Sequence, residues 1–242
     1  MASDSKTTVT VVEHTVFFKF RDGYTEEQEM DMYKGLWSFK DYFPSIMSMS
    51  LGCVLAKQPH GVTHVLVMRF ASREALATYL ADDYRIDISR KTITPFQSGE
   101  YSVDYEVDVD TDLSKLYKEG EKFNDGVDHV ELFTFKEGTS SSEVEEFMNF
   151  VADLPNKLQT DIVQLTSGTN YKPNDVFTHA FVVRLPSVEA LDAFVQDPAN
   201  VDMHKKGDSI FADILRVNYT IGESKKKILE ESLKESSKEV DT

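Results

Sequence analysis

Two pairs of histidines occupy matching places in this chain and are the first residues that could do chemistry. His14 and His129 are 115 residues apart, as are His64 and His179, and all four lie in apolar runs. A neutral imidazole both donates and accepts a proton near pH 7, so two histidines at one strand end could act as an acid/base pair or orient a carbonyl group. The alternative is structural: core histidines whose ring nitrogens bond to the backbone or to a neighbouring threonine.

A carboxylate accompanies the histidine in the second occurrence of this pattern. Glu131 follows His129 by two residues and so shares its face of an alternating strand, where the first occurrence has Val16. A carboxylate beside a histidine can fix the tautomer of the ring and raise its basicity. The other interpretation is an inward-facing charge that stays hydrated at a strand end. Tyr79, on the apolar stripe of a predicted helix, is a further candidate for proton transfer.

The sequence offers few residues for a metal or a cofactor. Zinc sites use three or four protein ligands, whereas each histidine pair supplies two, and Cys53 is the single cysteine. We predict Cys53 as a small apolar side chain within a strand, and His60 and His204 as surface loop residues without partners. No phosphate-binding loop, dinucleotide fingerprint, metalloprotease motif or nucleophile elbow occurs in the sequence. We therefore expect no metal and no cofactor.

Composition narrows the class of protein. A formal net charge of −16 disfavours a nucleic-acid partner, because binding a phosphate backbone needs clustered Lys and Arg, and it also disfavours an anionic membrane. A single cysteine excludes an intramolecular disulfide and suits a reducing compartment. No stretch approaches the ~18 apolar residues of a membrane span, and the first residues lack the apolar core of a signal peptide. These features predict a soluble cytoplasmic protein.

The histidine spacing belongs to the duplication of a whole domain. The segment HTVFFKFRDG (residues 14–23) aligns without a gap on HVELFTFKEG (residues 129–138), and VDY at 103–105 matches VNY at 217–219, there 114 residues apart. A domain-sized period indicates two domains rather than a solenoid. We predict domains at residues 11–107 and 127–221, an acidic linker at 108–126 with a short helix near 113–117, and a charged, solvent-exposed tail at 222–242.

Each copy has the same order of predicted elements: strand, helix, strand, strand, helix, strand. Alternating apolar and polar residues mark the strands, and the capping boxes Thr25–Gln28 and Ser140–Glu143 begin the first helices. Ser72 and Ser187 are expected to cap the second helices. After the first strand of each copy (residues 11–20 in the first), the predicted strands cover residues 47–57, 63–70 and 100–107, and then 161–171, 178–185 and 214–221.

This order predicts an α+β fold of two ferredoxin-like βαββαβ domains, each a four-stranded antiparallel sheet with its helices on one face. We expect the first and third strands to be neighbours that run parallel, which would bring His14 close to His64 and His129 close to His179. The other face of each sheet is still apolar, as at Phe17, and needs a cover. Two such faces in one chain can cover each other, so we predict a barrel within a monomer, an internal pseudo-dimer.

These segments resemble a known family. The runs VEHTVFFKF and GVTHVLVMRF and the Ser-x-Glu-Ala-Leu helix start are similar to those of the stress-responsive dimeric α/β-barrel (Dabb) family, over residues 11–107 and 126–221. The resemblance implies sheets paired as a barrel, in a family of stress proteins that includes olivetolic acid cyclase, which needs no cofactor. That cyclase uses a tyrosine on the second helix and a histidine just after it. Tyr79 matches the tyrosine, but Arg85 stands at the histidine's place, and the second copy has Phe194 and Asn200.

Three functions fit these observations. We expect a protein that binds a small apolar or aromatic molecule in a pocket between sheet and helices. One alternative is a cofactor-independent cyclase or lyase that acts on a polyketide-like or other reactive carbonyl compound by His/Tyr acid–base catalysis. The other is a purely structural stress protein with closed cores. The proton-transfer candidates are His14, His64 and Tyr79 in the first copy, and His129, Glu131 and His179 in the second. The expected pocket lining comprises Val16, Phe18, Tyr33, Trp37, Leu66, Phe133 and Phe181.

Overall fold

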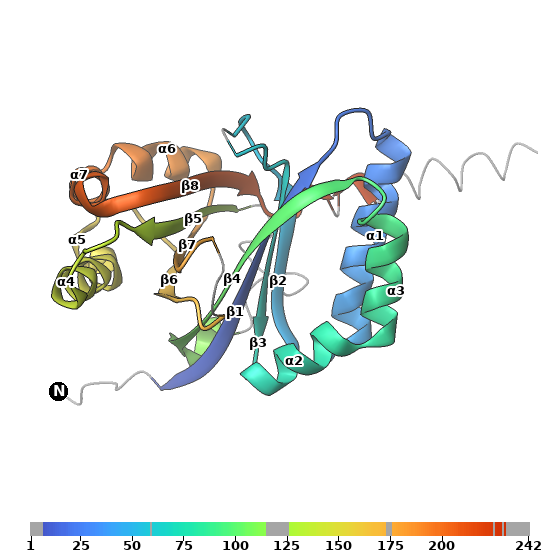
Figure 1. The fold of residues 1–242 in the computed structure, drawn as a ribbon, viewed down its shortest axis with the longest axis horizontal. Helices are drawn as coiled ribbons and strands as arrows, with labels where there is room; N and C mark the ends of the chain where they lie inside the picture. Colours follow the sequence, from blue (N-terminus) through green and yellow to red (C-terminus); the bar gives the residue numbers. More distant parts are fainter. Residues whose placement is uncertain are drawn as a thin grey trace, which may run out of the picture.

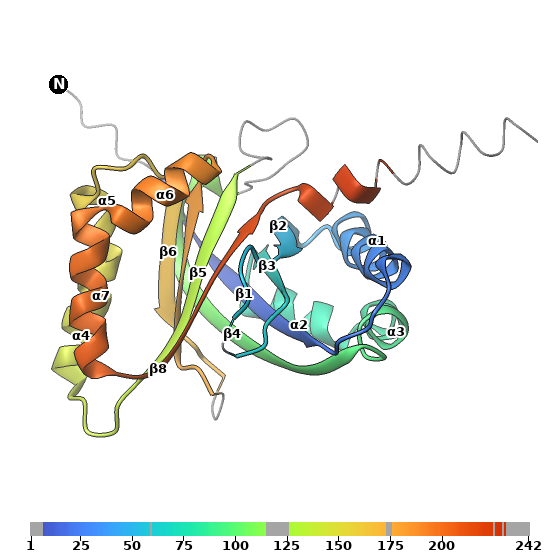
Figure 2. The ribbon, with the colours of Figure 1, turned by 90° about the horizontal axis from the view of Figure 1, so that it is seen from above.

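The computed structural model describes residues 7–58, 60–114, 126–172, 176–224, 226–228 and 230. Two four-stranded antiparallel sheets face each other at the centre of the molecule, and helices cover their outer faces (Figure 1 and Figure 2). The strand orders are β2-β3-β1-β4 and β6-β7-β5-β8, so the two sheets share one topology. The predicted α+β class with two ferredoxin-like domains is confirmed.

The elements follow the predicted order. The first half of the chain contains β1 (Thr8–Phe20), α1 (Glu26–Tyr42), β2 (Ile46–Cys53), β3 (His64–Phe70), α2 (Arg73–Ala81), α3 (Asp83–Thr92), β4 (Gln97–Asp110) and the 3-10 turn η1 (Thr111–Leu113). The second half contains β5 (Val127–Phe135), α4 (Ser141–Ala152), α5 (Leu154–Lys157), β6 (Gln164–Thr169), β7 (His179–Leu185), α6 (Val188–Gln196), α7 (Pro198–Ile210) and β8 (Phe211–Thr220). Most of the helix predicted near 113–117 lies outside the described residues.

The predicted helix starts are confirmed, and one feature was not predicted. Thr25 and Ser140 each form a capping box, which satisfies backbone N–H groups that have no partner within the helix. Ser72 caps α2 through its side chain as well. The single second helix expected in each copy is instead two, because an aspartate ends one helix and caps the next. Asp82 accepts hydrogen bonds from the backbone of the first turn of α3, and Asp197 does the same for α7.

The predicted direction of the first and third strands is wrong. β1 and β3 are antiparallel, and the register pairs His14 with Met68 and His64 with Phe18. The crossover through α1 makes β1 parallel to β2, and β3, which returns antiparallel to β2, inserts between them. His14 and His64 are therefore about four residues apart along the sheet, or ~14 Å. The same holds for His129 and His179, so neither histidine pair is a pair in space.

The inner sheet faces form a core that both halves share. Phe17, Val65 and Val67 of the first sheet are buried against residues of the second, including Val130 and Val182. The other sheet faces pack under their own helices in two separate cores. Burial of apolar area contributes roughly 25 cal/mol per Å², so this shared core stabilises the contact between the halves. The two sheets of this one chain thus pack face to face, as the predicted internal barrel requires.

Two tyrosines bring the sheets into close contact at the edges. Tyr105 of β4 lies over Gly168 of β6, and Tyr219 of β8 lies over Gly52 of β2. A Cβ at Gly168 would lie 2.7 Å from the Tyr105 Cβ, which is closer than real Cβ contacts come. The tyrosine hydroxyls also lie close to hydroxyls across the interface, 3.0 Å from Thr166 Oγ1 and 2.7 Å from Ser50 Oγ. Glycine at these two positions is therefore required by the tyrosine packing.

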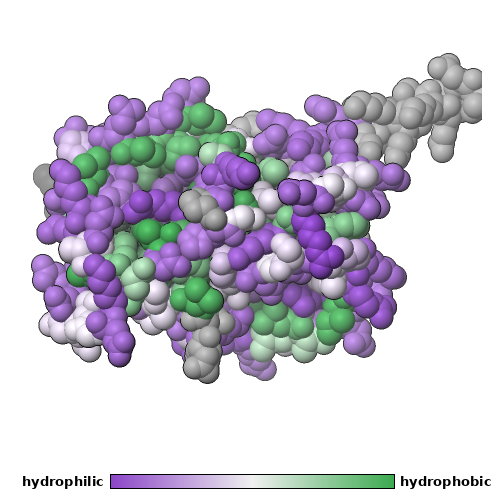
Figure 3. Space-filling view, turned by 45° about the horizontal axis from the view of Figure 1, so that its top comes forward, coloured by the Kyte–Doolittle hydropathy of each residue, from purple (hydrophilic) through white to green (hydrophobic). Residues whose placement is uncertain are grey.

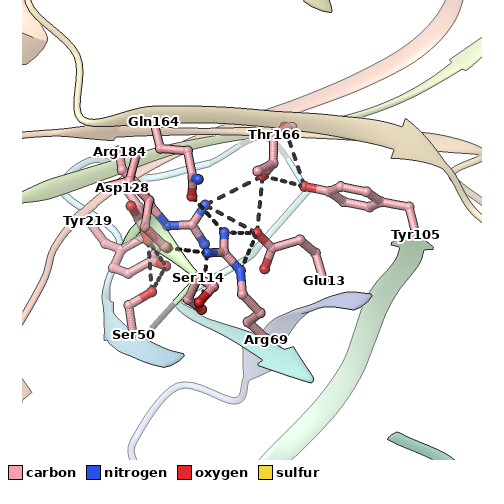
Figure 4. Close-up of polar contacts among 11 residues, drawn as sticks. Glu13, Ser50, Arg69, Tyr105, Ser114, Asp128, Gln164, Thr166, Arg184 and Tyr219 are labelled. Carbon is pink, nitrogen blue, oxygen red and sulfur yellow. Dashed lines mark hydrogen bonds and ion pairs between the residues drawn. The ribbon is translucent and has the colours of Figure 1, made fainter. Parts of the chain in front are cut away.

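A buried polar network lies in the middle of the shared core (Figure 4). Glu13 Oε1 accepts hydrogen bonds from Arg69 Nη2 at 2.5 Å and from Thr166 Oγ1 at 3.2 Å, and it lies 3.3 Å from Arg184 Nη1. Asp128 occupies the equivalent place in the second sheet and accepts bonds from Ser50 and Tyr219. Burial alone would raise the pKa of Glu13, but the two guanidinium groups hold it below its ordinary value. Two carboxylates and two arginines thus balance their charge across the barrel.

The start of the C-terminal tail does not extend into solvent as predicted. Ser224 is buried, and its Oγ donates to the backbone carbonyl of Leu51 and accepts from Trp37 Nε1 at 2.8 Å. Ile228 packs against the core under α1. Ser224 and Ile228 are four residues apart and so share one face of a helical turn. The charged composition of the segment did not indicate this buried face. The rest of the predicted tail lies outside the described residues.

The outer surface reflects the composition. The face in Figure 3 is mostly hydrophilic, with small apolar patches between charged residues. Exposed large hydrophobic side chains are scattered, for example Tyr42, Leu55 and Val176. Among the described residues, no helix is both long enough and apolar enough to cross a membrane.

The tyrosine–glycine contact gives a first prediction. Gly168→Ala should lower the free energy of unfolding by about 1–3 kcal/mol, because the new methyl group would overlap the Tyr105 side chain. Gly99→Ala is the matched control, since a Cβ there would have its nearest contact, Lys19 Cδ, at 3.6 Å. Urea unfolding of both variants measures the difference. Equal losses in the two variants would contradict a specific close approach.

The polar network gives a second prediction. Glu13→Gln should cost about 3–5 kcal/mol of stability, because it leaves the buried Arg69 and Arg184 without their shared carboxylate. Glu106→Gln removes a carboxylate that pairs with Arg73 at the surface and should cost less than about 1 kcal/mol. Chemical denaturation of both variants tests this. A loss below about 1 kcal/mol for Glu13→Gln would show that the network does not depend on the charge.

Candidate functional site

A cavity of about 240 Å³ lies in the first half, between the sheet and the helices. Five residues named from the sequence line it: His14, Val16, Phe18, Leu66 and Tyr79. Its remaining lining combines apolar groups with charged and polar ones: Leu36, Phe39, Leu80, Arg85, Ser89, Ile93, Thr94, Gln97, Glu100, Ser102 and Lys172. The cavity therefore has an apolar side and a polar side, and its share of polar groups is higher than in most small-molecule sites.

His14 is held by a carboxylate on the neighbouring strand. The register places His14 directly opposite Asp104 of β4, and His14 Nδ1 lies 2.6 Å from Asp104 Oδ1. Lys172 Nζ lies 2.6 Å from the other carboxylate oxygen. Burial would raise the pKa of Asp104, but His14 and Lys172 hold it below its ordinary value. An ionised Asp104 keeps the proton of His14 on Nδ1, so Nε2 is the nitrogen that can accept a proton.

The second half of the chain completes this cavity. Lys172 follows β6, and its segment is attached to the first sheet by two bonds to Asp104: the Tyr171 N–H donates to the Asp104 carbonyl, and the Asp104 N–H donates to Asn170 Oδ1. The equivalent contact on the other side joins the Leu55 N–H to the Asn218 carbonyl. The cavity therefore includes a cationic group that the first domain alone would lack.

Tyr79 and Arg85 lie on either side of the break between α2 and α3. The Tyr79 ring is buried, 6.2 Å from the His14 ring in an edge-on contact. The Arg85 guanidinium lies 5.7 Å from the centre of the Tyr79 ring. Burial raises the pKa of Tyr79 to about 12, and Arg85 opposes this rise. The Tyr79 phenol therefore keeps its proton near neutral pH and can act as a hydrogen-bond donor.

Aromatic rings stand at the corresponding positions of the second half. Phe181 stands where the first half has Leu66, and Phe194 where it has Tyr79. Their ring centres lie 5.9 and 5.3 Å from that of His129. The carboxylate of the first half is replaced as well, because His129 Nδ1 lies 2.7 Å from Asn218 Oδ1. The two halves share a backbone but present different groups at this place.

Glu131 contacts one arginine and two histidines. Its Oε1 lies 3.0 Å from His129 Nε2, 3.0 Å from Arg216 Nε and 3.3 Å from His204 Nε2. Burial would raise the pKa of this carboxyl, but His129 and the other two groups hold it below its ordinary value. The prediction of His204 as a surface loop residue without a partner is wrong, because α7 places it, half-buried, beside Glu131. This cluster has the properties of a buried ion-pair network.

The two Thr-His histidines lie at the other end of their sheets, away from His14 and His129. His64 is fully buried and its Nε2 lies 3.0 Å from Glu29 Oε1. His179 bonds to Thr178 and stacks on Phe133, with ring centres 5.6 Å apart. Burial lowers the pKa of His179 to about 4. His179 is therefore neutral at physiological pH and behaves as a core residue.

The remaining residues named from the sequence are placed away from the cavity. Tyr33 donates to Glu29, near His64, and Trp37 donates to Ser224. Phe133 packs under the helices of the second half. His60 was expected without partners, but its Nε2 lies 3.3 Å from Asp213, and its ring contacts Tyr101 and Phe177.

Two residues that complete the surroundings of His14, Asp104 and Lys172, were not predicted. Asp104 lies within the VDY segment that marks the repeat, but only the strand register shows that it faces His14. Lys172 becomes a cavity residue only through the contact between the halves. Neither relation has a local signal in the sequence.

The family of the chain follows from its likeness to known proteins. The family model of the Stress responsive A/B Barrel Domain matches residues 12–107 and residues 127–221. The chain belongs to this family. It is similar to a stress-response A/B barrel domain-containing protein of Arabidopsis thaliana, with 24% identity over 190 residues, covering 76% of this chain and 69% of the relative.

Solved structures of very low sequence identity share the fold over most of the chain. A candidate monooxygenase of Fusobacterium nucleatum superposes with a TM-score of 0.58 at 12% identity, covering 88% of this A/B-barrel chain and 92% of its own. An anthrone oxidase-like protein gives a TM-score of 0.57 at 10% identity, covering 91% of this chain and 93% of its own. At such identities the likeness shows the fold alone.

The lowered pKa of His179 gives a pH prediction. An unfolded histidine has a pKa of about 6.5, so between pH 6.5 and the folded pKa of about 4 the unfolded chain binds more protons than the folded one. The free energy of unfolding should therefore fall as the pH drops through this window, by on the order of 2–3 kcal/mol from this residue. His179→Phe should flatten the profile there.

Urea unfolding at several pH values between about 4 and 7 measures the slope. Phe135→Leu serves as control, because it weakens the aromatic packing around His179 while leaving the histidine in place. It should lower stability at every pH without changing the slope. A His179→Phe profile as steep as that of the wild type would contradict the prediction.

Proposed function

We propose that the first half of this A/B-barrel protein binds a small, mainly aromatic or apolar molecule carrying a carbonyl or hydroxyl oxygen. The observation that carries the proposal is the cavity lined by His14, with Asp104 behind it, and by Tyr79. Its apolar wall, Val16, Phe18 and Leu66 among others, suits a ring, and its polar wall suits one oxygen. Arg85 and Lys172 add positive charge beside that position.

The volume of the cavity limits the size of the ligand. About 240 Å³ is below the ~300–1,000 Å³ usual for drug-sized ligands. An engineered apolar cavity of ~150 Å³ accepts benzene. The proposed ligand is therefore a single ring with a short substituent.

The second half is proposed as a scaffold that supplies the partner sheet and Lys172. Phe181 and Phe194 occupy the space that Leu66 and Tyr79 border in the first half. The protein would thus have a single ligand site, in its first half. We further propose that it works as a cytoplasmic monomer, without nucleic-acid or membrane partners. Light scattering that gives the mass of a dimer would contradict the monomer.

A second candidate function is cofactor-independent chemistry on a carbonyl compound. The specific observation in its favour is the His14–Asp104 pair, since a buried carboxylate on Nδ1 orients the ring and stabilises the imidazolium that forms when Nε2 takes a proton. In this scheme His14 would remove a proton next to the substrate carbonyl. Tyr79, which keeps its proton at neutral pH, would donate a hydrogen bond to the developing oxyanion.

Binding is tested with 4-fluoroacetophenone, a single ring with one carbonyl, followed by fluorine NMR. Leu66→Phe introduces the residue type of the second half at this position and should weaken binding at least about tenfold, because it fills the cavity. Leu55→Phe, the same exchange at an exposed position, should bind as the wild type does. Wild-type protein that does not bind the probe, or binding unchanged in Leu66→Phe, would contradict the site.

The same probe separates binding from catalysis. A general base at His14 should speed the exchange of the methyl protons of 4-fluoroacetophenone with deuterium from the solvent. Asp104→Asn copies the Asn218 of the second half and should slow this exchange by about 10²–10⁴-fold while leaving probe binding largely intact. If the wild-type protein binds the probe but does not accelerate the exchange, His14 is not a general base. The proposal of a non-catalytic binding protein would then stand.

A further inference from the structure

A second group of reactive side chains lies at the opposite end of the first sheet from His14. Glu29 of α1, Cys53 at the end of β2 and His64 at the start of β3 each present one ligand atom, and the three atoms lie within 4.8 Å of one another. His64 Nε2 is 3.0 Å from Glu29 Oε1 and 3.5 Å from Cys53 Sγ. None of these three residues lines the cavity proposed to bind a ring.

The two distances from His64 Nε2 are close to those between ligands around one tetrahedral zinc ion. Zn–N and Zn–O bonds of ~2.0–2.1 Å place a nitrogen and an oxygen ligand about 3.3 Å apart, and a Zn–S bond of ~2.3 Å places sulfur about 3.6 Å from nitrogen. The observed separations differ from these by a few tenths of an ångström. Thiolate, imidazole and carboxylate are the three side-chain types that Zn²⁺ accepts.

The surroundings orient His64 for this role. The Thr63 hydroxyl donates to the Phe18 carbonyl, so at 3.0 Å from His64 Nδ1 it accepts the proton of that nitrogen. Once the proton between Nε2 and Glu29 is lost, the lone pair on Nε2 faces Glu29 and Cys53. Tyr33 Oη donates to Glu29 Oε1 at 2.9 Å and positions the carboxylate in the same way. Partners of this kind hold metal ligands in place in known sites.

We propose that Glu29, Cys53 and His64 form a binding site for one Zn²⁺ ion, with the fourth coordination position left to water. A carboxylate and a thiolate together neutralise the charge of the ion. The ion would replace the proton that Glu29 and His64 share and the proton of the thiol, both of which would pass to the solvent. The ion would join α1, β2 and β3 through side chains alone.

The C-terminal segment carries a competing cation. Lys227 Nζ lies 3.8 Å from Glu29 Oε1, and it reaches there because Ser224 anchors the segment to Trp37 and Leu51. A bound Zn²⁺ would repel this ammonium group. Lys227 therefore lowers the affinity of the site, and its removal should raise it.

The second half supplies an internal comparison. Thr169 pairs with His179 where Cys53 pairs with His64, and Val144 stands at the position of Glu29. His179 is surrounded instead by Phe133 and Phe135. The duplicated frame thus carries the three ligands in one copy only.

Cobalt(II) is the probe, because a Co²⁺–thiolate bond gives a charge-transfer band in the near ultraviolet and a tetrahedral site gives strong visible bands. Tag-free, full-length protein is titrated with Co²⁺ and then with Zn²⁺. One equivalent of Co²⁺ should produce both sets of bands, and one equivalent of Zn²⁺ should remove them. The conservative Cys53→Ser variant should lose the charge-transfer band, and His64→Gln should weaken Co²⁺ binding at least about tenfold.

The controls make the result decisive. His179→Gln should bind Co²⁺ as the wild type does, and Lys227→Gln should bind it more tightly, by about three- to tenfold. The absence of a thiolate band in the wild-type protein would overturn the proposal whatever the variants do. So would a band that persists in Cys53→Ser, or equal losses in His64→Gln and His179→Gln. Binding of 4-fluoroacetophenone, which uses other residues, reports on the cavity independently.

Discussion

The helix-free faces of the two sheets bury each other, and neither half could keep its face from water alone. Phe17, Val65 and Val67 on one side meet Val130 and Val182 on the other, and all are essentially inaccessible. A separate domain would expose this surface, and large exposed apolar patches lead to association. Placing both sheets in one chain makes the association intramolecular, so it is independent of protein concentration. The halves are therefore one folding unit in energetic terms, although the sequence repeats.

An apolar interface alone would specify the relative position of two flat sheets poorly, and the polar network supplies that specification. Glu13 can be satisfied only where Arg69, Arg184 and Thr166 meet it, and a slide of one sheet over the other would separate Glu13 from Arg184 and Thr166. The duplicated positions Asp128 and Glu13 show that the arrangement follows the approximate twofold relation of the halves. Burying these carboxylates and arginines costs desolvation free energy. The network therefore contributes more to a unique packing of the two sheets than to the stability of the fold.

The sequence predicted what depends on local chemistry or on periodicity. The capping boxes at Thr25 and Ser140 begin helices because their bonds are made within one turn. Strand alternation likewise assigned Phe17 and Phe18 to opposite faces correctly. Alternation carries no information on strand direction, and so the pairing of His14 with His64 was wrong. The proximity of Asp104, Lys172 and the Glu29 group depends on register and on the contact between halves, neither of which has a local signal.

Duplication permits the two halves to diverge because only the barrel interface must be kept in both. The shared face retains its glycine–tyrosine contacts and its acid–arginine pairs in each copy. The helix-covered face is free of that constraint, and there Leu66 and Tyr79 border a cavity, whereas the second copy has Phe181 and Phe194 at these positions. The second half contributes to this cavity, since Lys172 reaches Asp104 from across the interface. The second copy is therefore not dispensable, because the electrostatic environment of His14 depends on where that copy places Lys172.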